Sequence, residues 1–184
     1  MGSEMCIRDR PLFAAVDVHN NNGTNPHYAC MTDVTQDNQH LAAMFNHIGL
    51  YFRRPKGVST MAFNGKNPAI TIECARPGDE AGIEHGFEML DALLHIDHIP
   101  DRPVAPHDLQ LVRSLATLNI PDDVSFDFNL SAQADLTFEA GFDRMNFTEI
   151  KTTDVFAHTR VAKPLTITDQ HGEDVTDDLS LIHI

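Results

Sequence analysis

The sequence predicts an α/β domain built on a mainly parallel sheet, followed by a smaller β-rich domain. The runs LFAAVDV (12–18) and AITIE (69–73) are almost continuously apolar, as is typical of strands buried on both faces of a sheet. Apolar residues at helical spacing follow each run, as in alternating strands and helices. From residue 109 onward this spacing gives way to short alternating stretches. We therefore expect residues 11–103 to form a partial α/β domain and residues 104–178 a β-rich domain.

Two helices are expected in the first domain. Thr35 is a preferred N-cap residue, and the apolar spacing after it predicts an amphipathic helix over 36–48. Asp79 is a second N-cap, and the helix after it carries an apolar stripe that we expect to be buried: Ile83, Phe87, Leu90 and Leu94. Further short strands are expected at HYACM (27–31) and GLYF (49–52).

Alternating residues characterise the second domain. Val124, Phe126, Phe128 and Leu130 alternate with polar residues, which predicts a strand with one apolar face. The other short strands expected between turn signals are ADLTF (134–138), DVFAHT (154–159) and PLTITD (164–169).

Composition excludes some classes of partner. The 184 residues include 13 Lys and Arg against 27 Asp and Glu, and the net charge of −14 repels the phosphates of nucleic acids. No apolar run approaches the roughly 20 residues that span a bilayer, so we expect no membrane partner. Cys30 and Cys74 lie in apolar surroundings without a CxxC pattern, which indicates reduced, buried thiols of a cytoplasmic protein. The sequence does not predict an oligomeric state.

The two ends of the sequence differ in character from the rest. Codons for residues 4–10 can be written so that their reverse complement, read in another frame, encodes LSLIHI (179–184). This relationship is typical of a sequencing adapter translated as protein, and such segments are set aside in fold reasoning. We expect residues 1–10 and 179–184 to be adapter-derived and the natural chain to be an internal fragment.

Two polar residues close the predicted parallel strands. His19 ends the first run and Glu73 ends the later one, and functional residues gather at the carboxyl ends of strands in open α/β sheets. A neutral imidazole can bind zinc while a carboxylate acts as general base toward water on the metal. Alone, His19 also suits a turn and Glu73 a solvated strand end. Together they indicate part of a hydrolytic site, and a catalytic zinc needs about three protein ligands.

Three segments resemble the succinylglutamate desuccinylase and aspartoacylase family, a branch of the zinc carboxypeptidase fold. VDVHNNNGTNPHYA (16–29) is similar to the family's Asp-Leu-His segment, which supplies the third zinc ligand. GVSTMAF (57–63) followed by AITIECARPGD (69–79) is similar to the segment with the catalytic Glu. The β-rich region ending in PLTITDQHGEDVTDD (164–178) also fits, and the similarity covers nearly all of residues 11–178.

The resemblance implies a zinc-dependent hydrolase of an amide bond in an N-acyl amino acid or a similar small substrate. It makes His19 a ligand of one zinc ion, Glu73 the general base, and Asp17 a residue that orients the site. Candidate substrate-binding residues are Asn20, Ser59, Thr60 and Arg76.

Two features depart from the family pattern. The family's first two zinc ligands come from a His-x-x-Glu motif upstream of Asp-x-His, where this chain has only the adapter-like sequence. We expect those ligands upstream of the fragment, which should be inactive alone. Many relatives have Gly two residues after the catalytic Glu, where this chain has Ala75.

Other readings stay open. The alternative within the same chemistry is a carboxypeptidase acting on peptide C-termini, and the alternative from another class is a non-catalytic binding protein that retains the fold. The letters His85-x-x-Glu88 match the missing motif, but we expect them on a solvated helix surface. Surface or helix-end roles are the expectation for His95, His98, Arg53 and Arg54.

Overall fold

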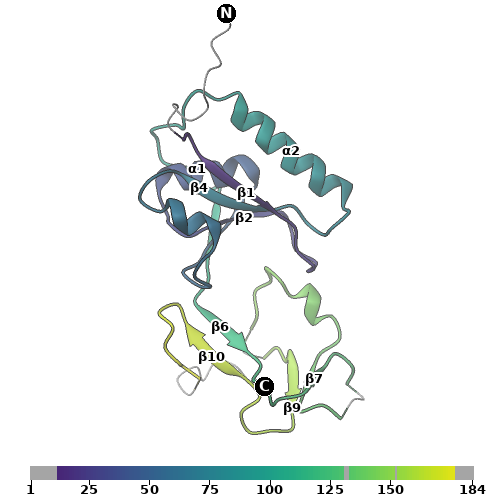
Figure 1. The fold of residues 1–184 in the computed structure, drawn as a ribbon. Coiled ribbons are helices and arrows are strands. Elements are labelled where there is room, and N and C mark those ends of the chain that lie inside the picture. Colours follow the sequence, from purple (N-terminus) through teal and green to yellow (C-terminus); the bar gives the residue numbers. More distant parts are fainter. Residues whose placement is uncertain (1–11, 131–132, 152, 177–184) are drawn as a thin grey trace, which may run out of the picture.

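A five-stranded mixed sheet forms the N-terminal unit of the computed structural model, which describes residues 12–130, 133–151 and 153–176 (Figure 1). Along the sheet the strand order is β1-β4-β2-β3-β5. The pairs β1–β4, β2–β3 and β3–β5 are parallel, and β2–β4 is antiparallel. The strands span Ala15–His19 (β1), Tyr28–Met31 (β2), Ile48–Tyr51 (β3), Ala69–Glu73 (β4) and Gln110–Arg113 (β5).

The prediction of a mainly parallel sheet is confirmed only in part, because β2 runs against β4. A parallel return needs a crossover of a dozen residues or more. The segment 20–27 that joins β1 to β2 is shorter than that, so β2 enters the sheet in the opposite direction. The prediction that the first strand is buried on both faces is wrong, since β1 lies at the edge of the described sheet and Val18 is half exposed.

Both predicted N-caps are confirmed. Thr35 accepts a hydrogen bond from the backbone N–H of Asn38 and opens α1 (Gln36–Phe45). Asp79 accepts one from Gly82 and opens α2 (Glu80–Leu94). Helix α1 ends three residues before the predicted end, because Ile48 already belongs to β3.

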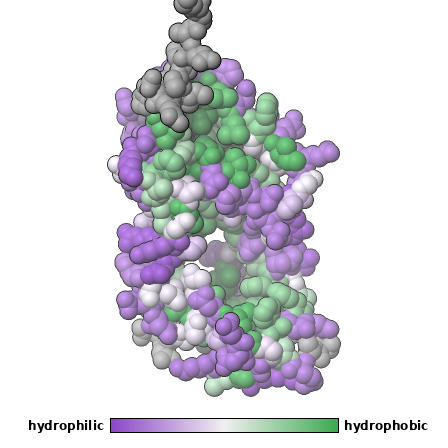
Figure 2. All heavy atoms as spheres, in the orientation of Figure 1, coloured by the Kyte–Doolittle hydropathy of each residue, from purple (hydrophilic) through white to green (hydrophobic). Residues whose placement is uncertain are grey.

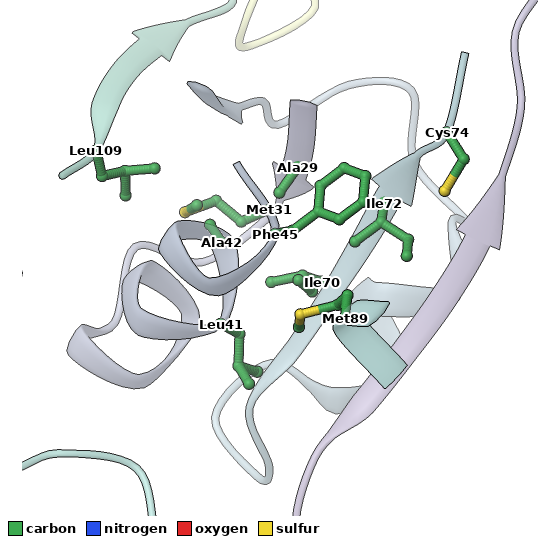
Figure 3. Close-up of a cluster of buried hydrophobic side chains, with 10 residues drawn as sticks. All are labelled: Ala29, Met31, Leu41, Ala42, Phe45, Ile70, Ile72, Cys74, Met89 and Leu109. Atoms are coloured by element: carbon green, nitrogen blue, oxygen red, sulfur yellow. The ribbon is translucent and has the colours of Figure 1, made fainter. Parts of the chain in front are cut away.

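The core of this unit lies between one face of the sheet and both helices. Figure 3 shows Phe45 of α1 and Met89 of α2 converging on Ile70 and Ile72 of β4. Ile70 and Ile72 are fully buried, and the other members of the cluster are Ala29, Met31, Leu41, Ala42, Cys74 and Leu109.

The expected buried stripe of α2 is exposed. Ile83, Phe87 and Leu94 are 66%, 67% and 84% exposed, and Leu90 is 37% exposed. The residues of α2 that face the core are Gly82, Gly86 and Met89. A Cβ atom on Gly82 would lie 1.8 Å from the carbonyl oxygen of Cys74, so the helix approaches β4 through its glycines. Close backbone approach therefore decides which side of α2 is buried.

The C-terminal unit is rich in short strands, as predicted. It contains a two-stranded sheet of β6 and β10 and a three-stranded sheet in the order β7-β8-β9. A small core around Leu136, Phe156 and Leu165 stabilises it. The strands span Ala116–Asn119 (β6), Phe126–Asp127 (β7), Leu136–Phe138 (β8), Ala157–Thr159 (β9) and Thr166–Asp169 (β10).

Two features of residues 104–130 differ from expectation. Strand β5 falls in the segment expected to open the β-rich domain, yet it pairs with β3 of the first sheet. The run from Val124 to Leu130 forms only the two-residue strand β7, and Phe126, Phe128 and Leu130 are more than half exposed. Phe128 stacks on Phe138, with 5.2 Å between the ring centroids. This aromatic contact, and not an extended strand, packs the segment against the unit.

The two units touch at several points. Tyr28 of β2 packs on Phe147 at 4.7 Å between ring centroids, and Arg54 donates a hydrogen bond to the carbonyl oxygen of His171. Cys30 and Cys74 are free and buried, which confirms the predicted burial of these thiols. Among the described residues, no helix has the length and apolar character needed to cross a bilayer. The expectations for residues 1–10 and 179–184 lie outside the described residues.

Candidate functional site

The structure brings His19 and Glu73 side by side. They are register partners at the carboxyl ends of the parallel strands β1 and β4. His19 Nδ1 lies 3.8 Å from Glu73 Oε1. Residues paired across parallel strands project from the same face of a sheet, here the face opposite the helices. Two residues 54 positions apart in the sequence thus form one polar cluster.

Asp17 holds the other side of the His19 ring. Its Oδ2 lies 3.2 Å from His19 Nε2, and Asp17 also accepts a hydrogen bond from the Ser59 hydroxyl. Ser59 opens a short 3-10 helix, η2 (Ser59–Phe63), that contacts both β1 and β4. A carboxylate on one ring nitrogen fixes the orientation of an imidazole. The Nδ1 edge of His19 therefore faces Glu73.

Glu73 is the most enclosed member of the cluster. Its side chain is 13% exposed, against 53% for His19 and 35% for Asp17. Asn21 donates a hydrogen bond from Nδ2 to Glu73 Oε2 at 3.3 Å, and Asn25 donates in turn to Asn21 Oδ1 at 2.9 Å. One oxygen of Glu73 is thus engaged by an amide while the other faces the imidazole.

Asn21 is a site residue that the sequence analysis missed, because Asn20 was named in its place. A signal for it was available. Side chains alternate in an extended chain, so Asp17, His19 and Asn21 share one side of the strand while Asn20 points to the other. The backbone N–H of Asn21 bonds to the carbonyl oxygen of Ala75, which continues the pairing of the two segments beyond the strand ends.

Ala75 lies at the turn after Glu73 and has a left-handed backbone, with φ of 69°. Its side chain is buried. This conformation is common for glycine and costly for alanine. The position at which this chain departs from the resembled family therefore has the backbone geometry that glycine provides.

The other predicted substrate-binding residues fall in two places. Thr60 is 2% exposed in η2, and its hydroxyl has no hydrogen-bond partner among the described residues. Asn20 and Arg76 instead line a cavity of about 530 Å³ between β1 and α2. Arg76 donates hydrogen bonds to the carbonyl oxygen of Gly23 and to the hydroxyl of Thr24. Arg76 thus holds the loop after β1 and does not contact Glu73 directly in these hydrogen bonds.

Burial and the charge of Glu73 shift the ionisation of its neighbours. Burial, with a smaller contribution from Glu73, raises the pKa of the Cys30 thiol to about 12. The same two causes raise the pKa of Cys74, and burial is the largest cause that raises the pKa of Tyr28. These thiols and this phenol stay neutral at physiological pH.

The donor types around His19 suit zinc, which binds imidazole nitrogen and carboxylate oxygen. The side chain of His19 is half exposed, and its Nδ1 lies on the side of Glu73. Within residues 12–130, 133–151 and 153–176, however, no group of three His, Cys, Asp or Glu side chains is arranged to hold a metal ion. The described residues therefore do not form a complete metal site by themselves.

The second histidine motif is not fully solvated, which corrects the expectation for His85. Its ring stacks on His27 at 4.8 Å and packs at a tilt against Phe45 at 4.6 Å between centroids, and its Nε2 is buried. Glu88 is largely exposed, with 3.9 Å between its Oε2 and His85 Nδ1. His95 and Arg53 bond locally, to the carbonyl oxygen of Asp91 and the hydroxyl of Tyr51.

Comparison of the chain with known proteins assigns no family or function to it. No family model matches the chain, and no curated protein or solved structure matches it significantly. The candidate site is therefore defined by its own residues: Asp17, His19, Asn21, Ser59 and Glu73.

Proposed function

We propose that this chain carries part of the active site of a zinc-dependent hydrolase that cleaves an amide bond of an N-acyl amino acid or a similar small substrate. The observation that supports it most is the pairing of His19 with Glu73 at the ends of two parallel strands. A general base must lie within reach of the water that it deprotonates, close to the group that binds the substrate or metal. The resemblance to the deacylase family supplies the reaction class.

In this proposal Glu73 moves the proton. Its Oε1 accepts a proton from the attacking water and returns it to the leaving amine. The amide of Asn21 on Oε2 keeps the carboxylate from rotating. The neutral phenol and thiols nearby do not compete as bases.

His19 would hold the metal through Nδ1, with Asp17 on Nε2 fixing the tautomer. Zinc, when bound, supplies Lewis acidity toward the scissile carbonyl and the attacking water. Two further ligands are expected upstream of this segment, as in the resembled family. The Ser59 hydrogen bond to Asp17 links η2 to this arrangement. The proposed protein is cytoplasmic, in keeping with the free thiols Cys30 and Cys74.

Amide hydrolysis by the complete reading frame that contains this chain tests the proposal. The protein is incubated with a panel of N-acyl amino acids and, separately, with short peptides, and the released amine is measured. We expect release from the N-acyl amino acids that stops on chelation and returns with added zinc. Release from peptide C-termini alone would indicate a carboxypeptidase. Metal-independent release, or none from either panel, would contradict the proposal.

A further inference from the structure

Helix α2 leaves its largest apolar residues uncovered. We name Ile83, Phe87, Leu90 and Leu94 the α2 stripe; three of the four are at least 66% exposed. They recur at steps of four, three and four residues, so they form a straight seam along one side of the helix. Figure 2 shows apolar residues gathered in the region of α2 and β1. Contiguous exposed apolar surface of this kind marks a binding face.

A cavity deepens the first half of the seam. It holds about 530 Å³ between Val18 of β1 and the side chains of Ile83, Phe87 and Leu90. Gly82 and Gly86, which carry no side chains, form part of its wall beside Cys74. The seam runs about 16 Å from Ile83 to Leu94 at 1.5 Å per residue. The cavity therefore has room for a large apolar side chain, and the seam suits an elongated polypeptide.

Charge restricts what can cover the stripe. Glu80, Glu84 and Asp91 lie roughly 50–90° around the helix from the centre of the seam, at about 100° per residue, and all three are exposed. Residues 80–94 contain no lysine or arginine. The opposite flank carries Gly82 and Gly86, which face the core. A segment bound on the stripe would therefore contact acidic side chains along only one of its sides.

This asymmetry argues against two other occupants. In an antiparallel two-fold pair of α2 helices each flank meets its own copy, which would oppose the two acidic rows. In a parallel pair the acidic row would have to meet the flank of Gly82 and Gly86, which faces the core. A membrane surface with anionic headgroups is repelled by the same row and by the net charge of −14. A helix with basic flanks can cover the apolar seam and pair with the acidic side chains beside it. Helices pack through matching apolar spacing.

We propose that the α2 stripe is a docking site for an amphipathic helix of a partner protein, with an apolar seam at four-three-four spacing and Lys or Arg beside it. A large apolar side chain of that helix enters the cavity between Val18 and Phe87. The basic side chains pair with Glu80, Glu84 and Asp91. The stripe lies on the helix-covered face of the sheet, whereas Glu73 and Asp17 project from the other. His19, Asn20 and Arg76 also line the cavity, so the docking site adjoins the proposed hydrolytic site.

Two synthetic peptides test this with the full chain. Both have about 20 residues, so that they can form helix in isolation, and both carry leucines at four-three-four spacing. One has flanking lysines and the other has glutamates at the same positions. Fluorescence anisotropy should show the lysine peptide binding at least tenfold more tightly than the glutamate peptide, with affinity falling as salt rises.

Three variants locate the binding. Phe87→Ser should weaken binding of the lysine peptide at least tenfold, while Ile150→Ser, at an exposed apolar position of the C-terminal unit, should leave it unchanged. Glu80→Lys combined with Glu84→Lys should reverse the preference toward the glutamate peptide. Circular dichroism confirms the fold of each variant.

Several outcomes would overturn the proposal. These are equal affinity for the two peptides, no binding of either, or binding that Phe87→Ser leaves intact. Sedimentation that shows a dimer of the chain, made monomeric by Phe87→Ser, would assign the stripe to a second copy and would also overturn it.

Discussion

His19 Nδ1 and Glu73 Oε1 lie 3.8 Å apart, although their residues are separated by the whole segment from the end of β1 to the end of β4. The register of two parallel strands produces this contact, because His19 pairs with Glu73 as the last of five successive pairs. Local geometry in β1 and β4 therefore fixes the distance between the proposed metal ligand and the proposed base.

Replacing Ala75 by glycine should stabilise the protein by about 1 kcal/mol, because alanine pays the steric cost of a left-handed backbone at φ of 69°. Denaturant unfolding followed by circular dichroism measures the change. Ala69→Gly is the matched control: Ala69 is buried in β4, and glycine there should destabilise by about 0.5–1 kcal/mol. Destabilisation by Ala75→Gly would show that the turn after Glu73 is not strained.

Truncation of two apolar residues on α2 distinguishes its two sides. Met89 is 3% exposed, so Met89→Ala should reduce the free energy of unfolding by about 2–5 kcal/mol. Leu94 is 84% exposed, and Leu94→Ala should change it by no more than about 0.5 kcal/mol. Similar losses for both variants in chemical denaturation would place the α2 stripe in the core.

Acid should destabilise the contact between His27 and His85. Burial, followed by the positive charge of His85, lowers the pKa of His27, while Asp79 acts in the opposite direction. Neutral His27 therefore contributes stability to the fold. This contribution is complete above the unfolded-state pKa of about 6.5 and is lost as the pH falls through the folded-state pKa. The melting temperature of His27→Phe should fall less than that of the wild type between pH 7.5 and 5. His107→Ala, at an exposed histidine, should behave as the wild type does.

Thiol reagents report on the burial of Cys30. Its pKa is raised to about 12 by burial first and by Glu73 second, and it is 8% exposed. Since the thiolate is the reactive form, Ellman's reagent at pH 8 should leave Cys30 unmodified in the folded chain and modify it in denaturant. Because the thiol holds its proton more tightly in the folded chain, it contributes stability that is complete below pH 9. This contribution is lost as the pH rises toward 12. Rapid modification of Cys30 in the native protein would contradict its placement in β2.

Local signals predicted much of the fold. Thr35 and Asp79 were identified as N-caps because their side chains act within three residues, and β4 was identified at its full extent from a continuous apolar run. The direction of β2 and the buried side of α2 depend on distant contacts. Helix α2 packs through Gly82 against the backbone of Cys74, and no periodicity of large apolar residues reveals that approach.

The candidate site was predicted in the same uneven way. His19 and Glu73 were found because each ends a strand, and parallel register brought them together. Asn21 was missed although it continues the alternation of Asp17 and His19. Arg76 contacts the loop at Gly23 and Thr24. These partners depend on the path that the chain takes after β1.

The most direct test of the central claim separates metal binding from proton transfer in the complete reading frame. Zinc content per chain and amide hydrolysis are measured for His19→Ala, Glu73→Gln and the control His107→Ala. We predict that His19→Ala loses zinc and activity, and that Glu73→Gln keeps its zinc but loses at least about a hundredfold in turnover. The control should retain both. Full zinc content in His19→Ala, or near-normal turnover in Glu73→Gln, would contradict the roles proposed for this pair.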